Sequence, residues 1–293
     1  MQDDLVKGTG MPTNTANMKI GDRVVVYNSM GYARLDGVPA HAEIVEGVGF
    51  TGHRWISAAH RLKDLPEHWF SAIMSAQQVE VFQQQVPLVV FDVDSTLIHE
   101  EVIELLAAHA GKEREVAEVT ERAMRGELDF ADSLHHRVAT LEDLPVEVLD
   151  EVASSATLHD GARELVRAVQ AAGGYVYAVS GGFTHALEPL ATQLGLDGFA
   201  ANTLEIVEGK LTGRVTGQVI DRAAKAAMLR RWATDHDIPL EATVAVGDGA
   251  NDLDMLELAG YGVGFCPKPI VRDHADCIVE VPTHEVLRVV LGF

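Results

Sequence analysis

The sequence is short of cysteine, of basic residues and of long apolar runs. Its two cysteines, Cys266 and Cys277, are too few for a disulfide scaffold, and neither belongs to a CxxC pair of the kind that holds structural zinc. Lys and Arg number 23 against 44 Asp and Glu, and the net charge of −21 disfavours nucleic acid and anionic membranes as partners. No stretch has the length of a membrane span, and the first residues lack the apolar run of a secretory signal. The sequence therefore predicts a cytoplasmic protein.

The composition that remains is that of a globular chain with room for two domains. Of the 293 residues, 47% are hydrophobic, which is enough to bury a sizeable core. The negative charge would also repel a small phosphorylated substrate. A phosphate site in this chain therefore needs local positive charge from a metal ion, a basic side chain or a helix N-terminus.

The chain before residue 86 differs in character from the chain after it. Residues 1–20 are polar and rich in turn formers, which predicts a disordered tail. Residues 21–85 read as a small α+β segment of unknown role, with strands expected at 23–28 and 32–35 and a helix over 67–85. No chemistry-bearing residues gather in this segment, so packing or oligomerisation is favoured over ligand binding. A homodimer is left open.

From residue 86 to residue 293, short apolar runs alternate with helical stretches, which is typical of α/β folds. The β-branched runs at 87–92, 175–180 and 243–248 each stop at a polar residue. Because ligands bind at the carboxyl ends of parallel strands, we expect Asp92, Ser180 and Asp248 at one site. The predicted core is a Rossmann-like parallel sheet.

Two further segments are expected to cover this site. The stretch between the first two runs is far longer than a simple crossover requires, and helix-forming segments fill it at about 100–155. This pattern predicts a helical cap inserted over the strand ends. Residues 204–220 alternate with glycines and predict a β-hairpin.

The first candidate motif, FDVDSTL, sets Asp92 and Asp94 two residues apart where a buried strand ends. Carboxylates this close repel each other, so one must be compensated by a cation or hold a proton. One acid can then act as a nucleophile while the other donates a proton. Alternatively, Asp94, Ser95 and Thr96 only turn the chain and open a helix.

Two further motifs supply groups that bind anions. VSGGF offers the Ser180 hydroxyl and the Gly181 amide, although a plain glycine turn has the same sequence. In DRAAKAAMLRRWA, Asp221 is the expected N-cap of a helix that carries Lys225 in its first turn. Most helical lysines, however, are only solvated.

The strongest single motif is GDGANDLDML, which follows a buried strand. It sets Asp248, Asn251 and Asp252 around the entry to a helix, and their oxygens suit a hard cation such as Mg²⁺. The alternative is an Asp-rich cap with an Asx turn.

Taken together and in this order, the four motifs resemble those of haloacid dehalogenase superfamily phosphatases, over residues 86–293. FDVDSTLIHEE, Phe130, Arg137, VSGGF and GDGANDLDML further resemble the phosphoserine phosphatases within that superfamily. Residues 21–85 match no pattern of the regulatory ACT domains that many of those enzymes carry.

The resemblance implies a covalent mechanism that depends on Mg²⁺. Asp92 would attack phosphorus and form an aspartyl-phosphate, and Asp94 would protonate the leaving oxygen and then deprotonate the attacking water. Mg²⁺ would be held by the Asp92 carboxylate, the Asp94 backbone carbonyl and Asp248.

The remaining roles that the resemblance implies concern the substrate. The phosphate oxygens would be bound by Lys225, Ser180 and Gly181, while Asn251 and Asp252 would position Lys225 or water around the metal. In the cap, Glu101 and Arg137 would bind an ammonium and a carboxylate, with Phe130 and Met124 as apolar walls. The expected reaction is hydrolysis of L-phosphoserine, the last step of serine biosynthesis. The alternatives are a phosphotransferase, or a phosphatase acting on another small phosphomonoester.

Overall fold

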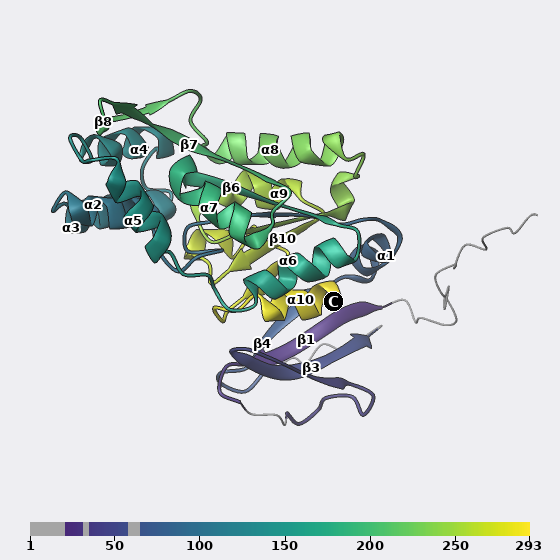
Figure 1. The fold of residues 1–293 in the computed structure, drawn as a ribbon. Coiled ribbons are helices and arrows are strands. Elements are labelled where there is room, and N and C mark those ends of the chain that lie inside the picture. The colour runs from purple at the N-terminus through teal and green to yellow at the C-terminus, as the bar shows by residue number, and fades with distance from the viewer. Residues whose placement is uncertain (1–20, 32–34, 58–64) are drawn as a thin grey trace, which may run out of the picture.

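The computed structural model describes residues 21–31, 35–57 and 65–293, which fold into two sheets with helices around the larger one (Figure 1). The predicted tail at 1–20 and most of the strand expected at 32–35 lie outside the described residues. Among the described residues, no helix is both long and apolar enough to cross a membrane.

The larger sheet has seven strands in the order β11-β10-β9-β5-β6-β7-β8, and all neighbours are parallel except β7 and β8. This arrangement confirms the predicted α/β fold with a parallel core and the predicted hairpin, which β7 and β8 form. The strands are β5 (Leu88–Phe91), β6 (Tyr175–Phe183), β7 (Gly198–Val207), β8 (Lys210–Thr216), β9 (Thr243–Gly247), β10 (Tyr261–Phe265) and β11 (Cys277–Val279).

Helices cover both faces of this sheet, which explains why its central strands are apolar throughout. All four residues of β5 are buried, and alternate residues face opposite layers. Val89 and Phe91 belong to a core cluster that includes α6 and α10, whereas Leu88 and Val90 pack in a cluster with α8 and α9. The helices around the sheet are α6 (Ala162–Ala171), α7 (Thr184–Leu194), α8 (Arg222–Asp235), α9 (Leu253–Leu258) and α10 (Glu285–Leu291), with 3₁₀ turns η1 (Leu240–Ala242), η2 (Ala250–Asp252) and η3 (Pro269–Val271).

The predicted helical cap lies between β5 and β6, at one end of the large sheet beside the β7–β8 hairpin (Figure 1). Its helices are α2 (Val102–His109), α3 (Glu113–Met124), α4 (Phe130–Ala139) and α5 (Glu147–Ser155). The hairpin contacts the cap directly, because the Asp143 N–H donates to the Leu211 carbonyl at 3.0 Å.

The smaller sheet is antiparallel, with strand order β2-β3-β1-β4. Its strands are β1 (Asp22–Asn28), β2 (Glu43–Gly47), β3 (Phe50–Ser57) and β4 (Phe70–Met74). It packs on the α/β core rather than standing apart. Val25 and Tyr27 share the core cluster of α10, and the Tyr261 hydroxyl donates to the Ile73 carbonyl at 2.8 Å. The division of the chain into domains at residue 86 stays a prediction.

The helix predicted over 67–85 is wrong in its first half. Residues Phe70–Met74 form β4, paired with β1, and α1 (Ala76–Gln84) begins only after Ser75. The Ser75 hydroxyl accepts from the Gln78 N–H at 3.3 Å, and the Gln78 side chain accepts from the Ser75 N–H at 3.0 Å. Pairing with a distant strand overrides local helix preference, and this capping box was the local signal for the later start.

Candidate active site

The ends of three adjacent strands bring the predicted acidic residues together. Since β5 lies between β9 and β6, Asp92 after β5, Asp248 after β9 and Ser180 in β6 meet at one edge of the sheet. The Asp92 N–H continues the ladder by donating to the Val246 carbonyl at 2.8 Å. All three side chains are buried.

The loop after Asp92 holds Asp94 in a defined orientation. One carboxylate oxygen of Asp94 accepts from the Val102 N–H at 2.7 Å, and the other accepts from the Ser180 hydroxyl at 2.9 Å. Ser95 takes a left-handed φ of +57°, so it turns the chain. It does not open a helix, which the sequence analysis gave as part of the same alternative. The next helix begins only at Val102, whose N–H donates to Asp94.

Lys225 lies beneath these acids, fully buried in the first turn of α8, where Asp221 is the N-cap as predicted. Its ammonium donates to Asp92 at 2.5 Å and to Asp252 at 2.7 Å. Burial lowers the pKa of Lys225, but the charges of Asp252 and Asp92 raise it by more, so the side chain stays cationic.

The cluster holds one buried ammonium and four buried carboxyl groups, so it carries excess negative charge when these groups are ionised. The four acids are Asp92, Asp94, Asp248 and Asp252. Burial and the charge of Asp252 raise the pKa of Asp92 well above its ordinary value and that of Asp248 to about 7. The pKa of Asp94 is also raised, chiefly by burial. A bound cation would offset this repulsion directly.

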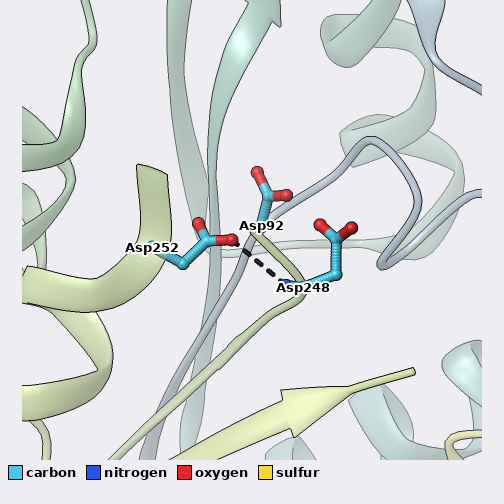
Figure 2. A group of neighbouring side chains, drawn as sticks. All are labelled: Asp92, Asp248 and Asp252. Atoms are coloured by element: carbon cyan, nitrogen blue, oxygen red, sulfur yellow. Dashed lines mark hydrogen bonds between the residues drawn. The ribbon is translucent and has the colours of Figure 1, made fainter. Parts of the chain in front are cut away.

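The donor set fits a hard divalent metal. Oxygens of Asp92, Asp248 and Asp252 lie within 4.8 Å of one another, and the three carboxylates face one another in Figure 2. Both oxygens of Asp252 are already used, one by Lys225 and one by the N–H groups of Asp248 and Gly249. By contrast, one oxygen of Asp248 and the Asn251 amide oxygen are buried without a hydrogen-bond partner. Asp92 and Asp248 are therefore the carboxylates available to a metal.

The cap closes over this cluster and leaves a cavity of only about 20 Å³. Both Glu101 and Arg137 line it, as the sequence predicted, and so do Phe130 and Met124. The full lining is Asp92, Asp94, Glu101, Ile103, Met124, Phe130, Leu134, Arg137, Gly181, Gly182 and Asn251. This volume holds about one water, so the cavity must widen before a larger molecule can bind.

Phe130 separates the closed cavity from a wider groove of about 400 Å³ between the cap and the core. The ring lies directly on Gly181, where an added Cβ would come within 2.5 Å of it. Phe130 and Asn251 line both spaces. The groove and the cavity therefore lie next to each other, with Phe130 and Asn251 between them.

One acidic and one basic side chain of the cap, Glu101 and Arg137, face the cavity. The Glu101 carboxylate accepts from the Ser95 hydroxyl at 2.8 Å, and burial followed by the charge of Asp94 raises its pKa well above the ordinary value. The Arg137 side chain is only 3% exposed, and it donates to the Thr120 hydroxyl at 2.9 Å and to the Ser133 carbonyl at 3.1 Å. It also donates to the Ser133 hydroxyl at 3.5 Å, and these three bonds leave two donors of its guanidinium for a ligand.

The sequence reasoning missed Lys268, a second cation beside the cluster. Its backbone N–H donates to the Asp248 carbonyl at 2.8 Å, and its ammonium donates to Glu121 of the cap at 3.0 Å. It follows β10, another parallel strand that ends at this edge of the sheet. That position was the available signal, since no motif marked it.

Comparisons with known proteins agree with this geometry. A family model for haloacid dehalogenase-like hydrolases matches residues 89–257. A phosphoserine phosphatase of Streptomyces coelicolor is 58% identical over 205 residues, which cover 70% of this chain and 50% of that protein. One of Streptococcus thermophilus is 49% identical over 195 residues, which cover 67% of this chain and 91% of that protein. The chain thus spans about half the length of the first relative.

Among solved structures, a phospho-aspartyl intermediate analogue of phosphoserine phosphatase matches with a TM-score of 0.68 and 42% identity. The match covers 70% of this chain and 99% of that one. Because the family model spans more than half of the chain, and its range includes Asp92, Lys225 and Asp248, the chain belongs to the haloacid dehalogenase-like hydrolase family and has phosphoserine phosphatases among its relatives.

Proposed function

We propose that this chain hydrolyses L-phosphoserine to L-serine and phosphate, through an aspartyl-phosphate on Asp92 and with Mg²⁺ as cofactor. The observation that carries the proposal is that one closed cavity is lined by the acid pair Asp92 and Asp94 and by the oppositely charged pair Glu101 and Arg137. The first pair suits phosphoryl transfer, and the second suits the ammonium and carboxylate of an amino acid.

Asp92 is the proposed nucleophile. Lys225 holds one of its oxygens at 2.5 Å, so the other oxygen is free to attack phosphorus. The bond from phosphorus to the serine oxygen breaks as the bond to Asp92 forms. Lys225, the Ser180 hydroxyl and the Gly181 amide would bind the transferring oxygens, and Asn251 would contact the phosphate.

Asp94 is the proposed acid and then base. Its raised pKa means that it holds a proton at a higher pH than a solvated carboxyl group does. It would give this proton to the departing serine oxygen, and then accept one from the water that cleaves the acyl phosphate. The bonds from Val102 and Ser180 fix its orientation.

Asp92, Asp248 and the backbone carbonyl of Asp94 would hold Mg²⁺, while Asp252 positions Lys225. When bound, the ion offsets negative charge on the nucleophile and the phosphate together. Divalent metals are used by phosphatases with this fold, and the unpartnered Asp248 oxygen supports a metal here.

Glu101 and Arg137 are the residues proposed to bind the amino-acid part of the substrate. Arg137 can bind a carboxylate through two parallel hydrogen bonds, and Glu101 can accept from an ammonium. Phe130 and Met124 restrict the space beside them, which favours a side chain as small as serine. The names of the matched relatives support this choice of substrate.

Phosphate release from L-phosphoserine, glycerol phosphate and p-nitrophenyl phosphate, with Mg²⁺ present, tests the proposal. The kcat/KM for L-phosphoserine should exceed that for the other two substrates by at least about tenfold, which is the effect expected of one hydrogen bond to a charged group. Equal rates on all three would point to a phosphatase of another small phosphomonoester. Adding glycerol tests the phosphotransferase alternative, which predicts less free phosphate and a new phosphoester.

A place in the last step of serine biosynthesis follows if this substrate is correct. The cytoplasmic location and the homodimer remain predictions from the sequence.

A further inference from the structure

One ion pair joins the cap to the sheet core beside the candidate active site. The ammonium of Lys268, which follows β10, donates to the Glu121 carboxylate of α3 at 3.0 Å. Among the described residues, the other ion pair that reaches the cap from outside is Lys210–Asp143, at 3.3 Å, and it comes from the β7–β8 hairpin. The hairpin is itself hydrogen-bonded to the cap. Within the described residues, Lys268 and Glu121 therefore form the ionic contact between the cap and the rest of the core.

The C-terminal end of α3, which carries Glu121, also packs on the loops at the strand ends. A Cβ added to Gly249 would come 2.8 Å from the Met124 sulfur, and one added to Gly126 would come 3.1 Å from the Ile270 side chain. Both contacts are close because a glycine stands on one side of each. The end of α3 therefore rests on the two core segments that follow β9 and β10.

Met124 makes this contact part of the candidate active site. Its side chain is 6% exposed and lines the closed cavity, which holds about one water. A shift of α3 away from the core would carry Met124 with it and widen the cavity. The contact between α3 and the core must therefore be broken if the cavity widens on this side.

Lys268 is held where it can stabilise this contact. Its backbone N–H donates to the Asp248 carbonyl at 2.8 Å, which fixes its position at the strand ends. Burial lowers the pKa of Lys268, but the hydrogen bond with Glu121 and the charge of Asp248 together raise it by more, so the ammonium stays charged. The side chains of Lys268 and Glu121 are 32% and 46% exposed, so water screens the pair only in part. The second oxygen of Glu121 accepts from Arg125 at 3.4 Å, which orients the carboxylate on α3.

We propose that Lys268 is a positioning residue that holds the end of α3 on the core and thereby keeps the cavity closed around a bound phosphoester. This role rests on the proposed function, since the substrate must be held in the closed cavity during turnover. While Lys268 and Glu121 are paired, α3 stays on the core; when the pair breaks, Met124 can move and the product can leave. Lys268 does not line the cavity, so its effect on turnover passes through Glu121 and α3.

A double-mutant cycle with p-nitrophenyl phosphate and saturating Mg²⁺ tests this role. Lys268→Met keeps the apolar stem and the backbone bond to Asp248, and Glu121→Gln keeps the shape of its side chain. Each should raise KM about threefold, as expected for the loss of one partly exposed ion pair, and neither should lower kcat. The double variant should have the same KM as either single variant, because both remove the same contact. Lys268→Arg should retain the wild-type KM.

The matched control is Lys112→Met, since Lys112 pairs with Glu115 at 2.9 Å at the start of the same helix, wholly inside the cap and with similar exposure. It should leave KM unchanged. A second readout needs no turnover, because iodoacetamide is larger than the closed cavity and reaches residue 124 only when the cavity opens. It should alkylate the Met124→Cys variant about threefold faster once Lys268→Met or Glu121→Gln is added.

The proposal is overturned if Lys268→Met raises KM and the alkylation rate while Glu121→Gln changes neither, because Lys268 would then act on Asp248 and not on the cap. Additive effects in the double variant, a fall in kcat with KM unchanged, or alkylation rates that stay the same in both variants overturn it as well. A wild-type chain that does not hydrolyse p-nitrophenyl phosphate would instead refute the proposed function, and the alkylation rates would still decide the role of Lys268.

Discussion

Replacing Glu101 by glutamine is the sharpest test of how the cap recognises the ammonium group of its substrate. Glu101 faces the cavity and accepts from the Ser95 hydroxyl at 2.8 Å, a bond that a glutamine amide oxygen can keep. The substitution is nearly isosteric, so the fold should be preserved. What is lost is the negative charge that would face the ammonium of phosphoserine.

The expected size of the effect follows from the surroundings of Glu101. A hydrogen bond to a charged group contributes about 1.5–3 kcal/mol, and the closed cavity screens it little. This corresponds to a loss of about tenfold to a hundredfold in kcat/KM for phosphoserine. The upper part of that range is limited because burial, followed by the charges of Asp94 and Asp248, raises the pKa of Glu101. Ionising this carboxyl group to bind the substrate therefore costs free energy.

The assay compares phosphoserine with p-nitrophenyl phosphate, which has no ammonium, in the wild type and in Glu101→Gln. The rate on p-nitrophenyl phosphate should change less than about threefold, because the phosphate groups are untouched. Glu118→Gln is the matched control, since Glu118 lies on the cap helix α3 but is exposed and does not line the cavity. Equal losses on both substrates, or none on phosphoserine, would refute this reading of the cap.

Three further predictions concern the metal, the entry and the core. EDTA should abolish turnover and Mg²⁺ should restore it, whereas Ca²⁺ should restore little because its coordination shell is larger and looser; activity in metal-free protein would contradict this. Phe130→Ala should raise KM for phosphoserine several-fold by widening the closed cavity, and an unchanged KM would show that the ring does not bound the substrate. His284 is buried, which lowers its pKa to about 3 from 6.5, so the unfolded chain binds its proton first and stability falls below pH 6.5. His284→Gln should remove about 2 kcal/mol of the stability lost between pH 7 and pH 5 in urea unfolding; an identical pH dependence would count against this assignment.

The chemistry at the strand ends was predictable because it depends on local patterns with a fixed geometric consequence. A buried β-branched run that stops at Asp92 or Asp248 places that carboxylate at the carboxyl edge of a parallel sheet. Lys225 could be placed from the Asp221 cap and the helical period. The helical cap follows from the length and the helical pattern of the segment between the first two strands, and the hairpin from residues that alternate with glycines.

What the sequence did not reveal depends on contacts between distant residues. The pairing of β4 with β1 could not be foreseen from residues 67–85, which have a helical composition. The left-handed turn at Ser95 is set by the hydrogen bonds of the loop around it rather than by its own preference. Lys268 matters only because the fold brings it to Asp248 and to Glu121.

The central claim, a covalent phosphoenzyme on Asp92, is tested most directly by trapping that species. The chain is mixed with [³²P]phosphoserine and Mg²⁺, quenched in acid within the first turnover, and digested to locate the label. We predict label on the peptide that contains Asp92, released by hydroxylamine as an acyl phosphate should be, and none in Asp92→Asn. Phosphate release without a labelled chain, or label that persists in Asp92→Asn, would contradict the account.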